Sequence, residues 1–296
     1  MSVHSKTWPA LARDIGKKRH NNEDYVLACE PGDEVLESTK GCLYIVADGI
    51  GGGAAGEVAS LFAAEAIAHH YYNRLDDPET ALKRAIAEAN VALYAYAHSH
   101  PRFATMGTTI VAAAIHSATL HFAHVGDSRA YLLRQKRIQR LTRDHNLAGQ
   151  LALGGILTTA EAERHPQRNL LLRSIGSERQ VQPDVGQAAL LAGDTLLLCS
   201  DGLTGRIADS EIGDIAAEST PNQAVRALID LANRRGGQDN ISVVVVRWGC
   251  EQDIPTSRED ILAGPPPLPD IDQIRRLDPT QSAAQPDPAS QRETTS

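Results

Sequence analysis

Several short segments of this chain carry apolar side chains on both faces of an extended strand. Alternate residues of a strand point to opposite sides of a sheet, so a strand that is apolar at nearly every position must be covered on both sides. The segments with this pattern are 43–47, 109–115, 119–125, 130–134, 195–199 and 241–248. They predict sheets enclosed between other layers of structure.

Helical periodicity identifies the layers that could cover such sheets. In one segment Leu82, Ile86 and Leu93 recur at helical spacing, and Pro78 stands in the first turn, where its missing N–H is tolerated. Strands come in consecutive groups separated by helical segments, which favours helices stacked on antiparallel sheets over an alternating parallel fold. The predicted class is therefore α+β, with helices over 56–72, 78–97 and 221–235.

Length, charge and cysteine usage limit the kinds of partner. The 296 residues are enough to bury a core without disulfides. A net charge of −8 argues against nucleic acid or an anionic membrane as partner, and no apolar run approaches the roughly 20 residues of a membrane span. The four cysteines are far apart and form no C-x-x-C pair, as expected of reduced thiols. We therefore expect a cytoplasmic protein, monomeric, whose partner is a protein or small molecule.

Composition divides the chain at about residue 250. Residues 1–249 run without a linker, whereas eight of the fifteen prolines and no aromatic residue follow Glu251. Too little apolar surface remains there to offset the entropy of ordering. We expect one domain over 1–249 and a Pro-rich, disordered tail over 250–296, in which Ile271, Ile274 and Leu277 offer one short amphipathic turn as the alternative.

Four aspartates share one context, beside glycine or a glycine-rich turn next to an apolar segment: Asp48, Asp127, Asp201 and Asp239. Taken singly, each could be a turn residue, because Asp-Gly is a common turn dipeptide. Carboxylates gathered at strand ends repel one another unless a cation neutralises them. An all-oxygen donor set favours Mg²⁺ or Mn²⁺ over Zn²⁺. The four together predict a divalent-metal site, and two bridged ions would suit a hydrolase.

A basic cluster and an acidic pair precede the first of these aspartates. Glu23 and Asp24 are candidate catalytic residues, of which Asp24 is the better placed to face metal-bound water; a solvated charged loop is the alternative. Arg19 suits a bidentate grip on phosphate. The glycine run 49–53 lacks the Lys-Ser/Thr of a phosphate-binding loop, so we interpret it as space for metals.

Seven motifs occur in an order that resembles the bacterial members of the PPM-type metal-dependent phosphatases, also called protein phosphatase type 2C. The resemblance spans about 14–248. The motifs are Arg-His-Asn-Asn-Glu-Asp at 19–24, Asp-Gly-Ile-Gly-Gly at 48–52, Gly-Glu-Val-Ala-Ser at 56–60, Met-Gly-Thr-Thr at 106–109, Val-Gly-Asp-Ser-Arg at 125–129, Ser-Asp-Gly-Leu at 200–203 and Asp-Asn at 239–240.

The resemblance implies a sandwich of two antiparallel β-sheets flanked by layers of helices, with a flap over about 144–176 beside the active site. A surface excursion without function is the alternative for the flap. It also implies hydrolysis of phosphoserine and phosphothreonine in proteins by a di-metal-activated water, opposing a serine/threonine protein kinase.

Roles for individual residues follow from the same resemblance. Asp48 would bridge two Mn²⁺ or Mg²⁺ ions, with the Gly49 carbonyl, Asp201 and Asp239 completing their shells. Asp127 would help to hold a third ion. Arg19 would bind the phosphoryl oxygens. Thr108 and Thr109 are interpreted as strand residues, not catalytic ones.

Two departures from the family pattern concern the leaving group. Relatives place a histidine directly after the Asp-Gly pair or three residues later, where this chain has Ile50 and Gly53. These two positions therefore supply no acid to protonate the leaving oxygen, and His145 and His165 in the flap are the first alternatives.

Two other functions are compatible with parts of the pattern. A pseudophosphatase would bind phosphoproteins through Arg19 without hydrolysis, which retention of the metal aspartates disfavours. A two-metal phosphodiesterase acting on nucleotides is disfavoured because no aromatic residue near the motifs offers base stacking.

Overall fold

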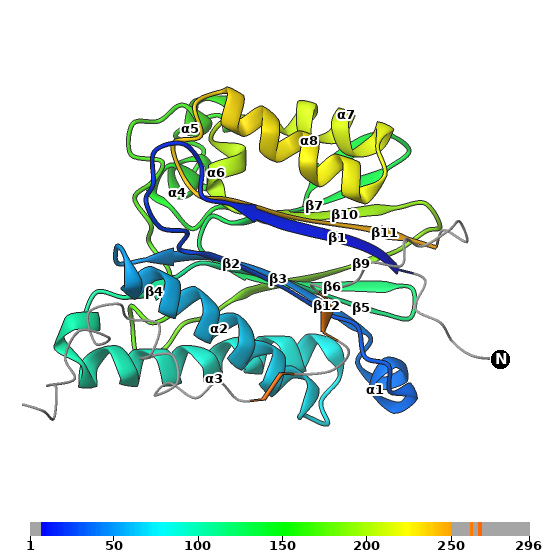
Figure 1. Ribbon diagram of the computed structural model, residues 1–296, viewed down its shortest axis with the longest axis horizontal. Coiled ribbons are helices and arrows are strands. Elements are labelled where there is room, and N and C mark those ends of the chain that lie inside the picture. The colour runs from blue at the N-terminus through cyan, green and yellow to red at the C-terminus, as the bar shows by residue number, and fades with distance from the viewer. Residues whose placement is uncertain (1–6, 250–260, 263–265, 268–296) are drawn as a thin grey trace, which may run out of the picture.

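Two β-sheets lie face to face, and helices cover the outer face of each (Figure 1). Helices α2 (Ala54–Tyr72) and α3 (Pro78–Ser99) cover one sheet, while α7 (Asp209–Glu218) and α8 (Pro221–Arg234) cover the other. The predicted α+β sandwich is confirmed. This computed structural model describes residues 7–249, 261–262 and 266–267.

The first sheet has the strand order β12-β2-β3-β5-β6-β9, and β4 pairs with the end of β3. Every pair in it is antiparallel except β12 with β2. Its strands are β2 (Asp24–Cys29), β3 (Cys42–Ile50), β4 (Gly107–Thr108), β5 (Ile110–His116), β6 (Thr119–Val125), β9 (Asp184–Ala189) and β12 (Ile261–Leu262).

The second sheet has the order β1-β11-β10-β7-β8, with every pair antiparallel. Its strands are β1 (Thr7–Asp14), β7 (Arg129–Arg134), β8 (Arg137–Arg140), β10 (Thr195–Cys199) and β11 (Ile241–Trp248). The short helices are α1 (Glu34–Thr39), α4 (Leu147–Leu153), α5 (Thr159–Glu163) and α6 (Asp201–Thr204), with a 3₁₀ turn at Pro101–Phe103.

Helix boundaries follow local capping chemistry. The Asp77 side chain accepts a hydrogen bond from the Thr80 N–H at the start of α3, directly before Pro78. Thr220 caps α8 in the same way, with Pro221 as the first helical residue. Each cap satisfies a backbone donor that the helix itself leaves unpaired.

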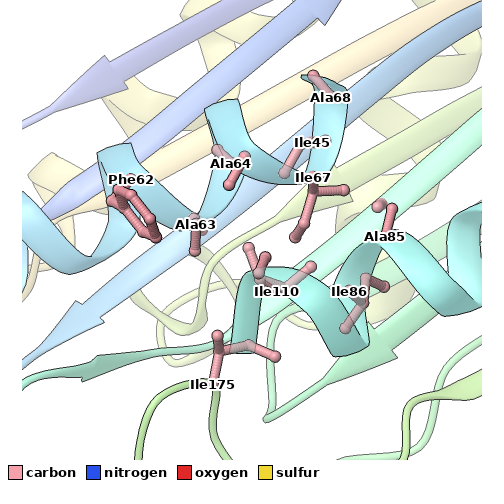
Figure 2. Packing of buried hydrophobic residues seen from close by; sticks show 14 of the residues in the cluster. Ile45, Phe62, Ala63, Ala64, Ile67, Ala68, Ala85, Ile86, Ile110 and Ile175 are labelled. Carbon is pink, nitrogen blue, oxygen red and sulfur yellow. The ribbon is translucent and has the colours of Figure 1, made fainter. Parts of the chain in front are cut away.

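The apolar character of both faces of the central strands is explained by the layers. Tyr44 and Val46 of β3 are buried between the two sheets, whereas Ile45 faces the helices. Figure 2 shows Ile45 and Ile110 packed against Ile67 of α2 and Ile86 of α3. Small residues on both helices, including Ala63, Ala64, Ala68 and Ala85, are buried in this layer.

The strands missed by the sequence analysis are mainly at sheet edges. Strand β1 pairs only with β11, β8 only with β7, and β9 only with β6. An edge strand is partly solvated and carries polar residues, so it lacks the apolar run that identified the central strands. Cys29, Cys42 and Cys199 are buried, as the prediction of buried thiols requires.

Part of the predicted tail contributes to the first sheet. Ile261 and Leu262, which follow residue 249, pair in parallel with Ala28 and Cys29 of β2. The predicted turn at Ile271, Ile274 and Leu277 lies outside the described residues. Across the described part of the chain, no helix combines the length and apolar character needed to cross a membrane.

Packing of α3 gives a stability prediction. Ile86→Ala should lower the free energy of unfolding by about 2–5 kcal/mol, because Ile86 is fully buried and its truncation leaves a cavity. Val91, 52% exposed on the same helix, supplies the control. Val91→Ala should change that free energy by no more than about 0.5 kcal/mol. Urea denaturation measures both, and similar losses for the two variants would contradict the packing described.

Candidate active site

The four predicted metal aspartates come from both sheets and meet at one end of the sandwich. Asp48 lies near the end of β3 and Asp127 in the turn after β6, both in the first sheet. Asp201 begins α6 after β10, and Asp239 precedes β11, both in the second sheet. In Figure 1 this is the end at which α4, α5 and α6 lie.

The carboxylates interact strongly. Withdrawal from water raises the pKa of Asp48 well above its usual value, and the charges of Asp24, Asp201, Asp127 and Asp239 raise it further. Burial is also the largest cause that raises the pKa of Asp24 to about 7 and that of Asp127 to about 8. Such a group of carboxylates is ionised together only when a nearby cation offsets their repulsion.

Two threonines fix the backbone of Asp48. The Thr109 hydroxyl accepts a hydrogen bond from the Asp48 N–H at 3.2 Å, and the Thr108 hydroxyl donates to the Asp48 carbonyl at 2.9 Å. Thr109 Oγ1 also lies 2.7 Å from Ser128 Oγ, next to Asp127. The two threonine hydroxyls therefore hold the main chain of Asp48 in place. Ser128 contacts one of them, a role that the sequence did not reveal.

Glu23 is buried against the glycine run and is only 8% exposed. Its Oε1 accepts a hydrogen bond from the Gly53 N–H at 2.7 Å, and its carbonyl accepts one from the Gly49 N–H at 3.1 Å. A Cβ on Gly56 would lie 2.1 Å from Glu23 Oε2, so only glycine permits this approach. Burial raises the pKa of Glu23. The Glu23 carboxylate thus holds the glycine turn at Gly53, and its main-chain carbonyl holds Gly49.

Asp24 is 1% exposed, which excludes the solvated-loop alternative. Its Oδ2 accepts a hydrogen bond from Ser200 Oγ at 2.8 Å, and Ser200 Oγ accepts one from the Ser242 N–H at 3.0 Å. These bonds connect the first sheet to the second directly beside Asp201. Among the described residues Asp24 Oδ1 has no hydrogen-bond partner, so this buried carboxylate oxygen is available to a ligand.

Arg19 lies beside Asp239. Its Nη2 donates to Asp239 Oδ2 at 2.8 Å, and its side chain is 48% exposed. Asn240 holds in place the segment that contains Arg19. Its Nδ2 donates hydrogen bonds to the carbonyls of Ile15 and Asn21, and its Oδ1 accepts one from the Glu23 N–H at 2.8 Å. Residues far apart in the sequence are thereby brought to one side of the aspartate cluster.

Residues 144–176 contain α4 and α5 and border a cavity of about 540 Å³. Asp127, Asp201 and Asp239 line this cavity, so it is continuous with the site. Asn146 connects the two, because its Oδ1 caps α4 and its Nδ2 donates to Asp127 Oδ2 at 3.4 Å. The segment therefore lies where the predicted flap was expected.

Neither flap histidine lines the cavity. His145 is 5% exposed, and its Nδ1 accepts a hydrogen bond from the Gly126 N–H at 3.2 Å. His165 Nδ1 accepts one from the Gln167 N–H at 3.2 Å. His145 is thus a buried structural residue, which removes it as an alternative proton donor.

His145 also belongs to a cluster with His124 and Asp184, whose ligand atoms lie within 4.8 Å of one another. Because Nδ1 of His145 accepts the Gly126 N–H, a neutral ring carries its proton on Nε2, which faces Asp184 Oδ2 at 3.3 Å. Arg173 also pairs with Asp184, at 2.8 Å. A cation there would have to displace the proton and compete with Arg173 for Asp184.

Comparison with known proteins agrees with this arrangement. The model of the protein phosphatase 2C family matches residues 17–242. The serine/threonine phosphatase stp of Listeria innocua is 38% identical over 245 residues, which are 81% of this chain and 95% of that protein.

Two solved structures have folds similar to that of this chain. The Mycobacterium tuberculosis serine/threonine phosphatase PstP/Ppp matches with a TM-score of 0.73 and 35% identity, over 82% of this chain and 99% of that one. A catalytic domain of the phosphatase PstP, solved in complex with two manganese ions, matches with a TM-score of 0.70 and 34% identity, over 81% of this chain and 97% of that one.

The sandwich and its carboxylate cluster define the class of metal-dependent protein phosphatases. The chain belongs to the protein phosphatase 2C family, and its activity is that of a protein-serine/threonine phosphatase.

The raised pKa values predict a pH-dependent stability in the presence of a chelator. Asp127 has a pKa of about 8 when folded, against about 3.9 when unfolded. The folded state binds this proton more tightly, so the stabilisation is complete below about pH 4 and is lost as pH rises through about 8. The melting temperature in EDTA should therefore fall more steeply between about pH 6 and 8.5 for the native protein than for Asp127→Asn.

Asp214→Asn, at an exposed position of α7, is the control and should keep the native slope. Saturating Mn²⁺ should reduce the difference between the native protein and Asp127→Asn. Parallel melting curves for these two proteins in EDTA would show that Asp127 does not carry this pH dependence.

Proposed function

We propose that this chain hydrolyses the phosphate monoesters of serine and threonine in proteins, with Mn²⁺ or Mg²⁺ as cofactor and without a covalent phosphoenzyme. The observation that carries the proposal is the meeting of carboxylates from two sheets beside a cavity that a substrate segment could enter. Divalent ions bound there would offset the charge of the carboxylates and lower the pKa of a coordinated water.

The donor set supports such a cofactor. Asp48, the Gly49 carbonyl, Asp201 and Asp239 would hold two central ions, and Asp127 would help to hold a third. All are oxygen donors, which suits hard divalent cations. A cation would relieve the repulsion that raises the pKa of Asp48.

Other residues act on the substrate or on its surroundings. Arg19 grips the phosphoryl oxygens with the guanidinium donors that Asp239 does not occupy. Asp24 Oδ1 accepts a hydrogen bond from water in the site, and Glu23 holds the glycine turn so that the Gly49 carbonyl is correctly placed. Ile50 and Gly53 carry no acid, so the leaving oxygen would take its proton from metal-bound water or from solvent.

The same proposal covers the cellular setting. The partners are phosphorylated proteins and a serine/threonine kinase whose action is reversed. The protein acts as a monomer in the cytoplasm. The free, buried thiols of Cys29 and Cys199 support a reducing compartment.

Metal dependence is the first test. EDTA should abolish hydrolysis of a phosphothreonine peptide, and Mn²⁺ or Mg²⁺ should restore it where Zn²⁺ does not, because all donors are oxygens. Phosphate release measures the rate. Full activity in chelator would overturn the metal assignment, while peptide binding with no hydrolysis in Mn²⁺ would favour a pseudophosphatase.

Substitutions should distinguish the aspartates that hold the two central ions from Asp127, which would help to hold a third. Asp239→Ala should lower kcat by at least about 100-fold and remove a tight Mn²⁺ site, because it removes a ligand of the central ions. Asp127→Ala should leave the tight sites intact. Isothermal titration with Mn²⁺ compares the two variants, and loss of the same sites in both would refute a separate third ion.

Arg19 should act mainly through substrate affinity. Arg19→Ala should raise KM for a phosphopeptide about tenfold or more, with a smaller fall in kcat, because a charged hydrogen-bond donor to phosphate is lost. Lys18→Ala, an exposed cation next to it, is the control and should leave both constants near native values. Unchanged kinetics for Arg19→Ala would remove its assigned role.

A further inference from the structure

The cavity beside the aspartates is rich in arginine. It lies between the flap and the loop that follows α6, and its lining includes Arg129, Arg140, Arg143, Arg168 and Arg206. A substrate residue next to the phosphorylated one would enter this space, because Asp201 and Asp239 line it too.

Two of these arginines are neutralised within the fold. Arg129 pairs with Asp144 at 2.7 Å and with Asp209 at 3.3 Å. Arg140 also pairs with Asp144. These contacts fix the root of the flap to the second sheet and leave little charge for a ligand.

Arg143, Arg168 and Arg206 form no ion pair with any residue in the described ranges. Apart from the metal aspartates and the two paired carboxylates, the acidic residue in the cavity lining is Glu163. Once cations offset the aspartates, three positive side chains face one negative one. The cavity then favours an anionic group.

Arg206 is the best placed of the three. The N–H of the preceding Gly205 donates to the Asp201 carbonyl at 2.7 Å, so Arg206 follows directly on the turn that begins with a metal aspartate. Its carbonyl accepts a hydrogen bond from Arg235 Nη1 at 3.0 Å, and Arg235 pairs with Glu211 at 2.7 Å. The backbone is therefore held, whereas the half-buried guanidinium has no hydrogen-bond acceptor in the part of the chain described.

The flap approaches the same point from the opposite wall. A Cβ on Gly205 would lie 3.8 Å from Arg168 Nη2, and Arg168 Nη1 is bound to the Glu163 carbonyl at 2.9 Å. An anionic side chain between the flap and α6 would thus meet positive charge from both walls.

We propose that Arg206 is a specificity-determining residue that binds an acidic side chain of the substrate, a carboxylate or a second phosphate, flanking the phosphoester to be cleaved. This inference rests on the proposed function and names the class of phosphoprotein that the site prefers. Planar guanidinium binds either anion in a bidentate manner.

The test uses the full chain with Mn²⁺ and a set of phosphothreonine peptides. Each peptide carries alanine, glutamate or phosphoserine at one of about three positions on either side of the phosphothreonine. At one position or more the native protein should show a kcat/KM about tenfold higher for an acidic residue than for alanine, the size of one charged hydrogen bond. The glutamate and phosphoserine arms distinguish the two anions.

Arg206→Gln should lose this preference and keep kcat/KM for the alanine peptide within about twofold, because that peptide never uses the subsite. Arg206→Glu should reverse it, so that acidic peptides become the poorer substrates. Arg226→Gln, at an exposed position of α8 outside the cavity, is the matched control and should keep the native preference.

Equal rates for acidic and neutral peptides in the native protein, or an intact preference in Arg206→Gln, would overturn the assignment. Fluorescence anisotropy with the same labelled peptides measures the preference independently of turnover. Tighter binding of acidic peptides without hydrolysis would therefore refute the proposed function and leave the subsite standing.

Discussion

Mutual repulsion among carboxylates at the junction of the two sheets is the constraint on which the rest of this structure depends. Besides burial, the charges of Asp127, Asp201 and Asp239 disfavour ionisation of Asp48, and the charge of Asp201 disfavours that of Asp127. Unaided, that arrangement opposes folding at neutral pH. A chain that keeps it needs a rigid framework to hold the carboxylates and a cation to neutralise them.

The framework is built from backbone hydrogen bonds and buried hydroxyls. Thr108 and Thr109 hold Asp48 through its main-chain N–H and carbonyl, not through its carboxylate. Ser200 joins Asp24 in the first sheet to Ser242 in the second. The two sheets therefore cannot slide past each other without breaking the site, and this coupling explains why polar groups are retained in an otherwise apolar interface.

The flap adds a second level of organisation. Its root is fixed by the Arg129–Asp144 pair and by His145, while Asn146 reaches Asp127. The same segment forms one wall of the cavity opposite Arg206. The carboxylates lie at the sheet ends, whereas Arg168 lies on the flap and Arg206 on the turn after α6. Catalysis and the proposed substrate preference thus depend on different surfaces.

The sequence by itself determined the central strands, the long helices and the four aspartates, because a strand apolar on both faces and an Asp-Gly turn are local patterns. Tertiary structure alone decided that Glu23 and Asp24 are buried and that His145 does not line the cavity. It also decided that, within the described ranges, Arg206 forms no ion pair while Arg129 forms two. Edge strands β1 and β9 were not predicted, because a strand with one partner is partly solvated and lacks the apolar run of a central strand. Local periodicity reports which face of a segment meets water, whereas burial of a charge and the pairing of an arginine depend on residues that only the folded chain brings together.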